Sequence, residues 1–402
     1  MIVYTLGDNE ELPQEVDLIE LRPDRTSLTH LNCPYLLTNQ PPTQDANYCD
    51  VPYPSPIGQL KKEFPLVKWV YSFHGTYLSF QKTAELIGEM FKERPEIVKC
   101  CFDTLKITDF LELIPLFEKY REQLVLFGKG EESQATRLLS YCLGAPWIYT
   151  SKEGFHGQIP LKDLSHIYYI QRVSRNTKIF ALIKGKESPP SIGYRLYNPL
   201  FFEKGIDALY INIVIDHDAL KTVMEHPLFS GFSITMPFKK QAFEYAKLHD
   251  ENALICQTIN TYYQGVGYNT DVEILKQIPF EGKKVGILGG GGVSKAFTNK
   301  LKGSCDLKVY KRNPKKRIEF ESQTSVPCLC IDNIDEDLDI LIDTLPIQWV
   351  TKNLKKTTQV LDMKVDFNQA YSSQINFIDG LDAFKAQGQK QLQIFFSYEF
   401  FL

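Results

Sequence analysis

Several features are absent from this 402-residue chain. No apolar run reaches the length of about 18 residues that a membrane-spanning helix needs. Met1–Leu6 carries no cationic region ahead of a long apolar segment, so we expect no secretory signal peptide. The 45 Lys and Arg residues are balanced by 49 Asp and Glu residues, and no basic tail is present, so nothing favours nucleic acid as a partner. These absences predict a cytoplasmic protein.

Zinc-type cysteine spacing is also absent. The nine cysteines include Cys100-Cys101 and Cys328-Leu329-Cys330, but no paired Cys-x-x-Cys motif occurs. We therefore expect buried thiols in a reducing compartment, and no metal site. The hydrophobic content of 43% is sufficient for well-packed cores, and the length allows two or three domains.

The most informative feature that is present is a run of four glycines, 289–292, between a short apolar run and residues suited to a helix. A parallel strand that turns sharply into a helix needs glycine there. A surface without side chains also lets a pyrophosphate approach the backbone and the helix N-terminus. We expect Gly289, Gly291 and Gly292 to bind a dinucleotide in a Rossmann-type domain. A flexible turn is the alternative explanation.

The second strand of this domain, predicted at 307–310, is followed by a cationic cluster at 311–316. An NAD site usually places an acidic residue about 20 positions after the glycines, where it binds the ribose 2′-hydroxyl. Cations at that place suit a 2′-phosphate instead. The predicted cofactor is therefore NADP(H).

Polar residues that suit ketone reduction lie ahead of the glycines. Lys239 follows a strand that ends at a proline, and Asn260-Thr261 and Asn269-Thr270-Asp271 come later. Reducing a ketone needs a proton donor at the carbonyl oxygen, and a lysine coupled to a carboxylate can supply it. Taken singly, each motif could instead be a surface lysine or a turn.

In order and spacing, these motifs and the late Gly380-Leu381…Ala386-Gln387 resemble the shikimate dehydrogenase family. The resemblance implies that Lys239 and Asp271 are the catalytic pair, and that Arg312 and Lys316 hold the 2′-phosphate. It also implies a set of shikimate contacts: Ser191, Thr235, Asn260 and Gln387. The chain departs from the family at 191–198, where only the first serine and the asparagine are kept, and at Val365, where the family has a tyrosine.

Residues 1–150 contain eight short β-like runs: Ile2–Leu6, Asp17–Arg22, Tyr35–Thr38, Tyr48–Pro52, Trp69–His74, Ile97–Phe102, Gln123–Phe127 and Pro146–Thr150. Helical patterns lie between the later runs. This alternation predicts a (β/α)8 barrel. The barrel should be trimmed, because the Pro-rich stretch 40–55 leaves no room for a full helix between the third and fourth strands.

Charged residues inside these strands are candidates for chemistry. Lys99 lies within an apolar run, and burial disfavours its charge, so we expect its pKa to fall towards that of a nucleophile. Glu20 and Arg22 alternate with Leu21, so both can point inward. The alternatives are a lysine that faces out from the barrel edge and, for His74, a structural core histidine.

Together with the motifs at 17–24, 72–74 and 97–99, these residues resemble type I 3-dehydroquinate dehydratase. The resemblance implies that Lys99 forms an imine with the substrate ketone and that His74 moves the proton. It further implies a set of substrate contacts: Glu20, Arg22, Arg137 and Gln158. The segment 38–44 departs from the family, because it lacks the family's arginine and glutamate.

The order of the two halves is that of bifunctional enzymes of aromatic amino-acid biosynthesis. We expect a barrel at 1–170, a two-lobed α/β dehydrogenase with its substrate lobe at 171–270 and its NADP domain at 271–379, and a helix at 380–402 that returns to the substrate lobe. The predicted function is dehydration of 3-dehydroquinate followed by NADPH-dependent reduction to shikimate. One alternative is an active dehydrogenase with an inactive barrel, and another is a non-catalytic sensor of shikimate-pathway metabolites.

Overall fold

The computed structural model describes residues 1–7, 10–22, 33–334, 337–345, 354–355, 358–364, 377–378 and 380–397. The chain divides into two compact units, Met1–Phe229 and Ser230–Leu402. The finer domain boundaries stay predictions, and Val365 lies outside the described residues. Within the described ranges, no helix has the length and apolar character needed to cross a membrane.

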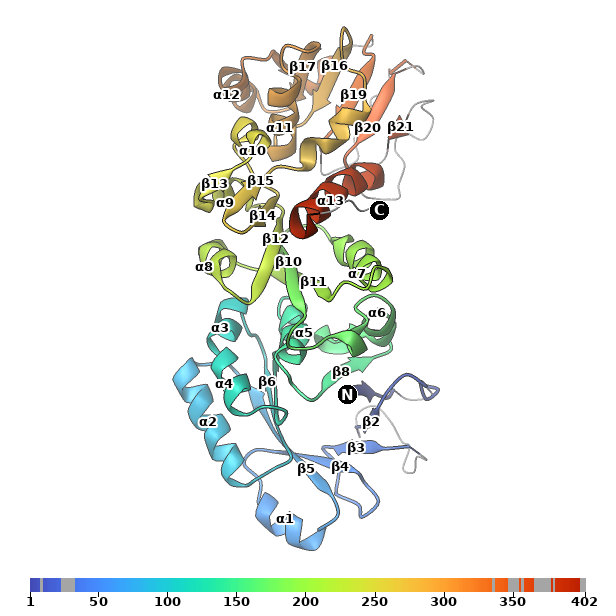
Figure 1. Ribbon diagram of the computed structural model, residues 1–402, viewed down its shortest axis with the longest axis vertical. Helices are drawn as coiled ribbons and strands as arrows, with labels where there is room; N and C mark the ends of the chain where they lie inside the picture. Colours follow the sequence, from blue (N-terminus) through green and yellow to red (C-terminus); the bar gives the residue numbers. More distant parts are fainter. Residues whose placement is uncertain are drawn as a thin grey trace. The chain divides into compact units, whose positions relative to one another are not determined.

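The eight β-like runs all form strands in the first unit, in one parallel sheet that we call the first sheet (Figure 1). The strands are β1 (Ile2–Thr5), β2 (Leu18–Leu21), β3 (Tyr35–Thr38), β4 (Tyr48–Pro52), β5 (Lys68–Gly75), β6 (Ile97–Phe102), β7 (Leu124–Gly128) and β8 (Ile148–Ser151), with a short β9 (Ile159–Pro160). Strand β1 pairs with both β2 and β8, so the first and last predicted strands are neighbours.

Closure of the predicted barrel is incomplete. The strand order is β7-β6-β5-β4-β3-β2-β1-β8-β9, and β7 and β8, both fully described, do not pair. Side chains meet across this seam instead, with the rings of Phe127 and Tyr149 6.1 Å apart between centroids. Helix α5 (Gln134–Cys142) connects the two strands and contacts both. A full ring of backbone hydrogen bonds is therefore not present.

Helices follow the later strands of the first sheet: α1 (Ile57–Glu63), α2 (Phe80–Lys92), α3 (Ile107–Glu112), α4 (Ile114–Lys119) and α5. Helix α2 begins where the Ser79 side chain accepts a hydrogen bond from Lys82 N, and it buries Thr83, Ile87 and Met90 along one stripe. Residues 39–47, between β3 and β4, contain no helix, as the prolines predicted. Helix α1 was not predicted.

The parallel register places the polar residues of several strands on one side of the first sheet. Paired residues of parallel strands point the same way, and residues two apart on a strand share a side. The pairs Thr5–Glu20, Thr38–Asp50 and Ser72–Lys99 follow this rule. Tyr149 of β8 pairs with Val3, two residues before Thr5. We call this side the interior face.

The first unit continues with η1 (Phe155–Gly157), α6 (Leu161–His166), η2 (Ile170–Arg172), β10 (Lys178–Lys184), α7 (Gly193–Glu203), β11 (Ala208–Val214), η3 (His217–Ala219) and α8 (Leu220–Glu225). Strands β10 and β11 are parallel. The Asn198 amide of α7 bonds both the N (2.7 Å) and the O (2.9 Å) of Tyr210 in β11. Arg195 of α7 pairs with Asp163 of α6 at 2.7 Å. The segment 191–198 therefore contributes to packing.

The second unit begins with β12 (Phe229–Ile234), α9 (Lys239–Tyr245), β13 (Leu248–His249), α10 (Glu251–Cys256), β14 (Thr261–Tyr263), β15 (Val266–Tyr268) and η4 (Asp271–Gln277). Strand β14 is antiparallel to both β12 and β15. The last helix, α13 (Gly380–Phe396), packs on this region, with the Phe395 ring 5.7 Å from that of Tyr263.

A six-stranded parallel sheet forms the rest of the second unit (Figure 1). It consists of β16 (Lys284–Leu288), β17 (Asp306–Lys311), β18 (Cys328–Cys330), β19 (Ile340–Asp343), β20 (Gln359–Asp362) and β21 (Phe377–Ile378), with α11 (Gly292–Leu301), α12 (Pro314–Thr324) and η5 (Ile331–Asn333). In the order β18-β17-β16-β19-β20-β21, successive strands are added outward from β16 on one side and outward from β19 on the other. The topological switch point therefore lies between β16 and β19. Ligands of doubly wound folds bind at that switch point. The predicted Rossmann-type sheet is confirmed.

Candidate active sites

Lys99 lies at the centre of the interior face. Its ammonium pairs with the Asp50 carboxylate of β4, and both side chains are buried. The same nitrogen lies 5.1 Å from the ring centroid of Tyr149 in β8. Side chains of β4, β6 and β8 therefore meet, so the first sheet curls around a shared interior.

The expected fall in the pKa of Lys99 is wrong. Burial is the largest single cause and does act to lower this pKa, but the charges of Asp50 and Glu20 and the hydrogen bond to Asp50 together raise it. The resting lysine therefore carries its proton. Sequence reasoning missed Asp50, although an aspartate between apolar Cys49 and Val51 was the same kind of signal that identified Lys99.

Glu20 is held by hydroxyl groups of the neighbouring strands. The hydroxyl of Thr5 donates to one carboxylate oxygen at 2.6 Å, and that of Thr38 donates to the other at 2.9 Å. The side-chain amide of Gln158 in turn donates to the Thr5 hydroxyl at 3.2 Å. Two predicted substrate contacts are thus connected through Thr5.

Arg137 is a buried cation without a carboxylate partner among the described residues. Its guanidinium carbon lies 4.1 Å from the Phe127 ring centroid, and one terminal nitrogen donates to the His156 carbonyl at 3.2 Å. Burial lowers its pKa to about 10, so it stays charged at neutral pH. A buried cation of this kind stabilises an anionic ligand.

His74 lies near the end of β5, on the interior side of the strand by register. The residue is exposed, yet protein atoms crowd its ring, and desolvation followed by the charge of Lys99 lowers its pKa to about 4. Arg22 acts in the same direction. The six residues predicted for the dehydratase therefore share one interior, with a neutral histidine beside a protonated lysine.

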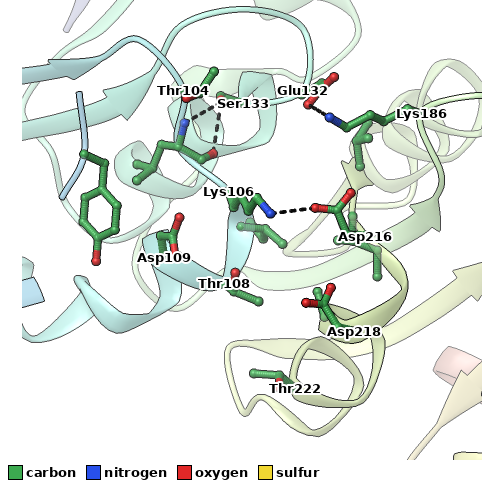
Figure 2. Close-up of a pocket in the computed structure, with 16 residues that line it drawn as sticks. Thr104, Lys106, Thr108, Asp109, Glu132, Ser133, Lys186, Asp216, Asp218 and Thr222 are labelled. Atoms are coloured by element: carbon green, nitrogen blue, oxygen red, sulfur yellow. Dashed lines mark hydrogen bonds and ion pairs between the residues drawn. The ribbon is translucent and has the colours of Figure 1, made fainter. Parts of the chain in front are cut away.

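A separate cavity of about 380 Å³ lies within the first unit, beyond the ends of β6, β7, β10 and β11. Figure 2 shows two ion pairs at its wall, Lys106–Asp216 at 2.8 Å and Lys186–Glu132 at 2.7 Å. None of the predicted site residues lines this cavity. Exposed charges of this kind have no distinctive sequence signal, so sequence reasoning did not find it.

The second site, in the second unit, is built around Lys239 and Asp271. Lys239 begins α9, Asp271 begins η4, and the ammonium lies 2.5 Å from a carboxylate oxygen. The Asn260 amide donates to the other oxygen of Asp271 at 2.8 Å and to Gln387 of α13 at 3.3 Å. Four residues predicted for the dehydrogenase, from distant parts of the sequence, are therefore in contact.

Two further predicted shikimate contacts, Thr235 and Ser191, are not among these four contacting residues. Thr235 follows β12, and its carbonyl accepts a hydrogen bond from Phe238 N at 2.9 Å in the turn that leads to Lys239. Ser191 belongs to the first unit, where its hydroxyl oxygen accepts from Gly193 N at 3.2 Å. The predicted roles of Thr235 and Ser191 stay predictions.

The glycine run forms the predicted turn from strand β16 into helix α11. Gly289 has φ +113°, and a Cβ there would lie 2.5 Å from the Thr344 hydroxyl. A Cβ at Gly292 would meet only Thr258, at 3.8 Å, and none of the described atoms lies within 4 Å at Gly291. The backbone at the helix N-terminus is thus open to a pyrophosphate, as the residues of a dinucleotide site require.

The cationic cluster lies beside this turn, because β17 pairs with β16 up to Tyr310 and Leu288. Arg312 and Lys316 are exposed, and the Asn313 side chain accepts from Lys316 N at 3.1 Å, which caps α12. The segment 311–318 contains no acidic residue. These residues suit a 2′-phosphate, and the described part of the chain shows no cluster of metal-ligating side chains.

Part of the chain is similar to shikimate dehydrogenases in sequence and in fold. The family described as shikimate dehydrogenase substrate binding domain matches residues 183–262. A solved shikimate dehydrogenase in complex with NADP+ covers 56% of this chain and 92% of its own, with a TM-score of 0.50 and 22% identity. This part of the chain has a shikimate dehydrogenase-like α/β fold.

Longer relatives extend the match to the N-terminal half. The shikimate biosynthesis protein AroDE of Chlamydia trachomatis is 24% identical over 75% of this chain and 66% of its own length. The bifunctional 3-dehydroquinate dehydratase/shikimate dehydrogenase of Arabidopsis thaliana, a chloroplast protein, is 22% identical over 77% of this chain and 60% of its own. The chain thus spans slightly under two thirds of these relatives, and the predicted resemblance to the bifunctional fusion is confirmed.

Proposed function

We propose that the chain is a bifunctional shikimate-pathway enzyme that dehydrates 3-dehydroquinate and reduces the product, 3-dehydroshikimate, with NADPH. The observation that carries this proposal is the presence of two lysine–aspartate pairs, Lys99–Asp50 and Lys239–Asp271, each surrounded by the polar residues of its own motif. The names of the relatives support both activities.

In the first reaction, Lys99 attacks the substrate ketone. Because the resting lysine is protonated, its proton must first pass to a neighbouring base, and the Asp50 carboxylate is in contact with it. The nitrogen then bonds to the carbonyl carbon, and the carbonyl oxygen leaves as water. The resulting imine acidifies the adjacent C–H bond, and neutral His74 takes that proton as general base. Loss of the β-hydroxyl as water and hydrolysis of the imine complete the reaction.

Binding in this interior rests on the charge of Arg137. The substrate is a carboxylate, and Arg137 is a buried cation that forms no ion pair among the described residues, although the charge of Glu20 acts on it. Gln158 and Arg22 add hydrogen-bond donors to the same interior, while Glu20 can accept from substrate hydroxyls. This arrangement favours a polyhydroxylated anion over a neutral sugar.

In the second reaction, the glycine turn, Arg312 and Lys316 would hold NADPH, which would supply the hydride for the carbonyl carbon. Lys239 donates a proton to the carbonyl oxygen of the substrate, and Asp271 holds the ammonium in place from 2.5 Å. The amide of Asn260 fixes that carboxylate, so the orientation of the donor is set before substrate arrives. Ser191, Thr235 and Gln387 complete the shikimate contacts by resemblance.

The decisive experiment traps the imine. Borohydride added with 3-dehydroquinate should reduce the imine, inactivate dehydration and leave a stable mass increase on Lys99. An adduct on another lysine of an active protein would contradict the assignment.

The same preparation, given 3-dehydroquinate and NADPH, should show enone formation followed by NADPH loss. Reduction without dehydration would favour the inactive barrel, which the absence of the family's arginine and glutamate in 38–44 motivates. Binding without either reaction would indicate a sensor.

Cofactor preference is tested at the cationic cluster. Replacing Arg312 and Lys316 by glutamine should raise the KM for NADPH about tenfold or more and leave NADH use unchanged, because a charged hydrogen bond to phosphate is worth about 1.5–3 kcal/mol. Lys302→Gln is the matched control, since this exposed lysine follows the opposite end of α11 from the glycine turn. Equal use of NADPH and NADH by the unmodified protein would refute the cofactor assignment.

A further inference from the structure

Tyr149 of β8 faces Lys99, yet the proposed dehydration steps do not use it. The side chain lies on the interior face and the residue is only 4% exposed. Its ring centroid is 5.1 Å from the Lys99 ammonium. The ring thus contacts the group that carries the chemistry, from the strand at the seam of the first sheet.

The hydroxyl of Tyr149 is buried and has no hydrogen-bond partner among the described residues. A buried hydroxyl left unpaired costs about 1–3 kcal/mol, so such groups are rare and need an explanation. Burial and then the charges of Glu20 and Asp50 raise the pKa of Tyr149 well above its ordinary value. The phenol therefore stays neutral and can donate a hydrogen bond.

Two other unpaired polar atoms belong to the same interior, namely Arg137 Nε and Gln158 Oε1. Arg137 packs on Phe127, whose ring contacts that of Tyr149, and Gln158 is bonded to Thr5 of the strand that pairs with β8. Both oxygens of Glu20, in contrast, are satisfied by protein hydroxyls. Two donors and one acceptor of the interior that contains Lys99 thus have no hydrogen-bond partner among the described residues. Their chemistry is complementary to a polyhydroxylated carboxylate.

We propose that Tyr149 is a substrate-binding residue of this interior. Its hydroxyl donates a hydrogen bond to a substrate oxygen, and its ring stabilises the positive charge on the Lys99 nitrogen. That charge is present in the resting ammonium and again in the protonated imine, so the ring favours both states. The inference rests on the proposed dehydratase function and adds a residue that the family motifs did not identify.

The test is Tyr149→Phe, which removes one oxygen and keeps the ring. The KM for 3-dehydroquinate should rise about tenfold while kcat changes by less than about threefold, because a contact made equally in ground state and transition state appears in KM. The Tm should be unchanged or higher, because the variant removes an unpaired buried hydroxyl. A purely structural tyrosine would show a lower Tm and an unchanged KM.

The matched control is Tyr35→Phe. Tyr35 is a buried tyrosine of β3 on the opposite side of the first sheet, since it pairs with Ile19 rather than with Glu20. Its KM should equal that of the unmodified protein. Tyr149→Leu removes the ring as well and should raise KM at least as much as Tyr149→Phe, whereas kcat should change little, because the ammonium and the protonated imine lose the same aromatic contact.

The outcomes separate this inference from the function on which it rests. If the unmodified protein forms no borohydride-trapped adduct at Lys99, the dehydratase proposal fails. If that adduct forms in both proteins and Tyr149→Phe has an unchanged KM, only the role of Tyr149 is overturned. A loss confined to kcat would also overturn the ground-state contact proposed here.

Discussion

Each unit contains one proposed catalytic lysine–aspartate pair, and these two pairs differ in how far solvent reaches them. The side chains of Lys99 and Asp50 are 4% and 2% exposed. Those of Lys239 and Asp271 are 18% and 4% exposed. In both pairs the aspartate is buried, so the difference lies in the lysine.

This difference in exposure matches two kinds of chemistry. A lysine enclosed with its aspartate can exchange its proton only with groups inside the same interior, which suits a nucleophile that must be deprotonated at the moment of attack. A lysine that is partly open presents its ammonium to an incoming carbonyl, which suits a proton donor. The same two residue types can therefore serve two reactions because their surroundings differ.

The largest effect should come from Lys99→Met. Dehydration should fall by about 10⁴-fold or more, because the proposed imine forms on the Lys99 nitrogen. Stability should fall by about 3–5 kcal/mol, because the variant leaves the Asp50 carboxylate buried without its cation. Denaturant unfolding and a dehydration assay measure the two losses.

The control for this variant is the double change Lys99→Met with Asp50→Asn. It removes the unpaired charge, so it should recover much of the stability and none of the activity. If Lys99→Met unfolds no more easily than the unmodified protein, water reaches the Asp50 carboxylate and the pair is not buried.

Lys239→Ala should lower the kcat of reduction by about 10²–10⁴-fold, the usual contribution of a positioned proton donor. NADPH binding should persist, since the glycine turn does not depend on this lysine. The loss of stability should be smaller than for Lys99→Met, because water can reach the remaining Asp271 carboxylate once the partly open lysine is removed. Dehydration should be unchanged, and a variant with unaltered kcat would make Lys239 a surface residue.

Asp271→Asn separates orientation from proton donation. Asparagine keeps the shape of the side chain and its capacity for hydrogen bonds but loses the charge that holds the Lys239 ammonium. Reduction should be clearly impaired, yet less than in Lys239→Ala, as kcat measurements with 3-dehydroshikimate would show. A loss equal to or larger than that of Lys239→Ala would assign the chemistry to the aspartate.

The strands that carry these pairs were predictable, and the contacts across them were not. Apolar runs bounded by turn residues located all eight strands of the first sheet, and β3, β4 and β6 have the predicted bounds. The glycine run and the cationic turn likewise located the first two strands of the Rossmann-type sheet. Local pattern is sufficient for such elements, because each is defined by its own residues.

What sequence could not supply is which strands face one another. Asp50 and Lys99 are 49 positions apart and meet only because the first sheet curls. The sequence does not show that contact, so the pKa of Lys99 was predicted from burial alone and was expected to fall. The charges around Lys99 raise it instead. The same applies to Tyr149, whose unpaired hydroxyl is visible only once β8 is placed beside β1. Long-range contacts, rather than local propensity, decided the electrostatics.

The pH dependence should distinguish the two sites as well. The pKa of His74 is lowered to about 4, so the proposed base stays neutral down to mildly acidic pH. The kcat/KM of dehydration should therefore hold between about pH 7 and pH 5 and decline as pH approaches 4. An acidic limb near the ordinary histidine value of about 6.5 would mean that His74 is not desolvated, or is not the base.

The sign of the effect on stability follows from proton binding. The unfolded chain binds a proton at His74 below about pH 6.5, whereas the folded protein resists it until about pH 4. Within this window the unfolded state holds more protons, so the contribution of His74 to stability rises with pH and is lost as pH falls. His74→Ala should flatten this part of the stability profile.

The smallest effect is expected for Lys106–Asp216, the ion pair at the cavity of Figure 2. Its side chains are 67% and 41% exposed, so water screens the attraction, and a double-mutant cycle of Lys106→Met and Asp216→Asn should give a coupling below about 1 kcal/mol. At about 1 M salt the screening length in water falls to about 3 Å, so the coupling of this exposed pair should fall close to zero, whereas the buried Lys99–Asp50 coupling should persist. The lysine–aspartate pairs are expected to differ in coupling energy because they differ in solvent exposure. A coupling of Lys106 with Asp216 that survives high salt would show that exposure does not control the coupling energy of these pairs.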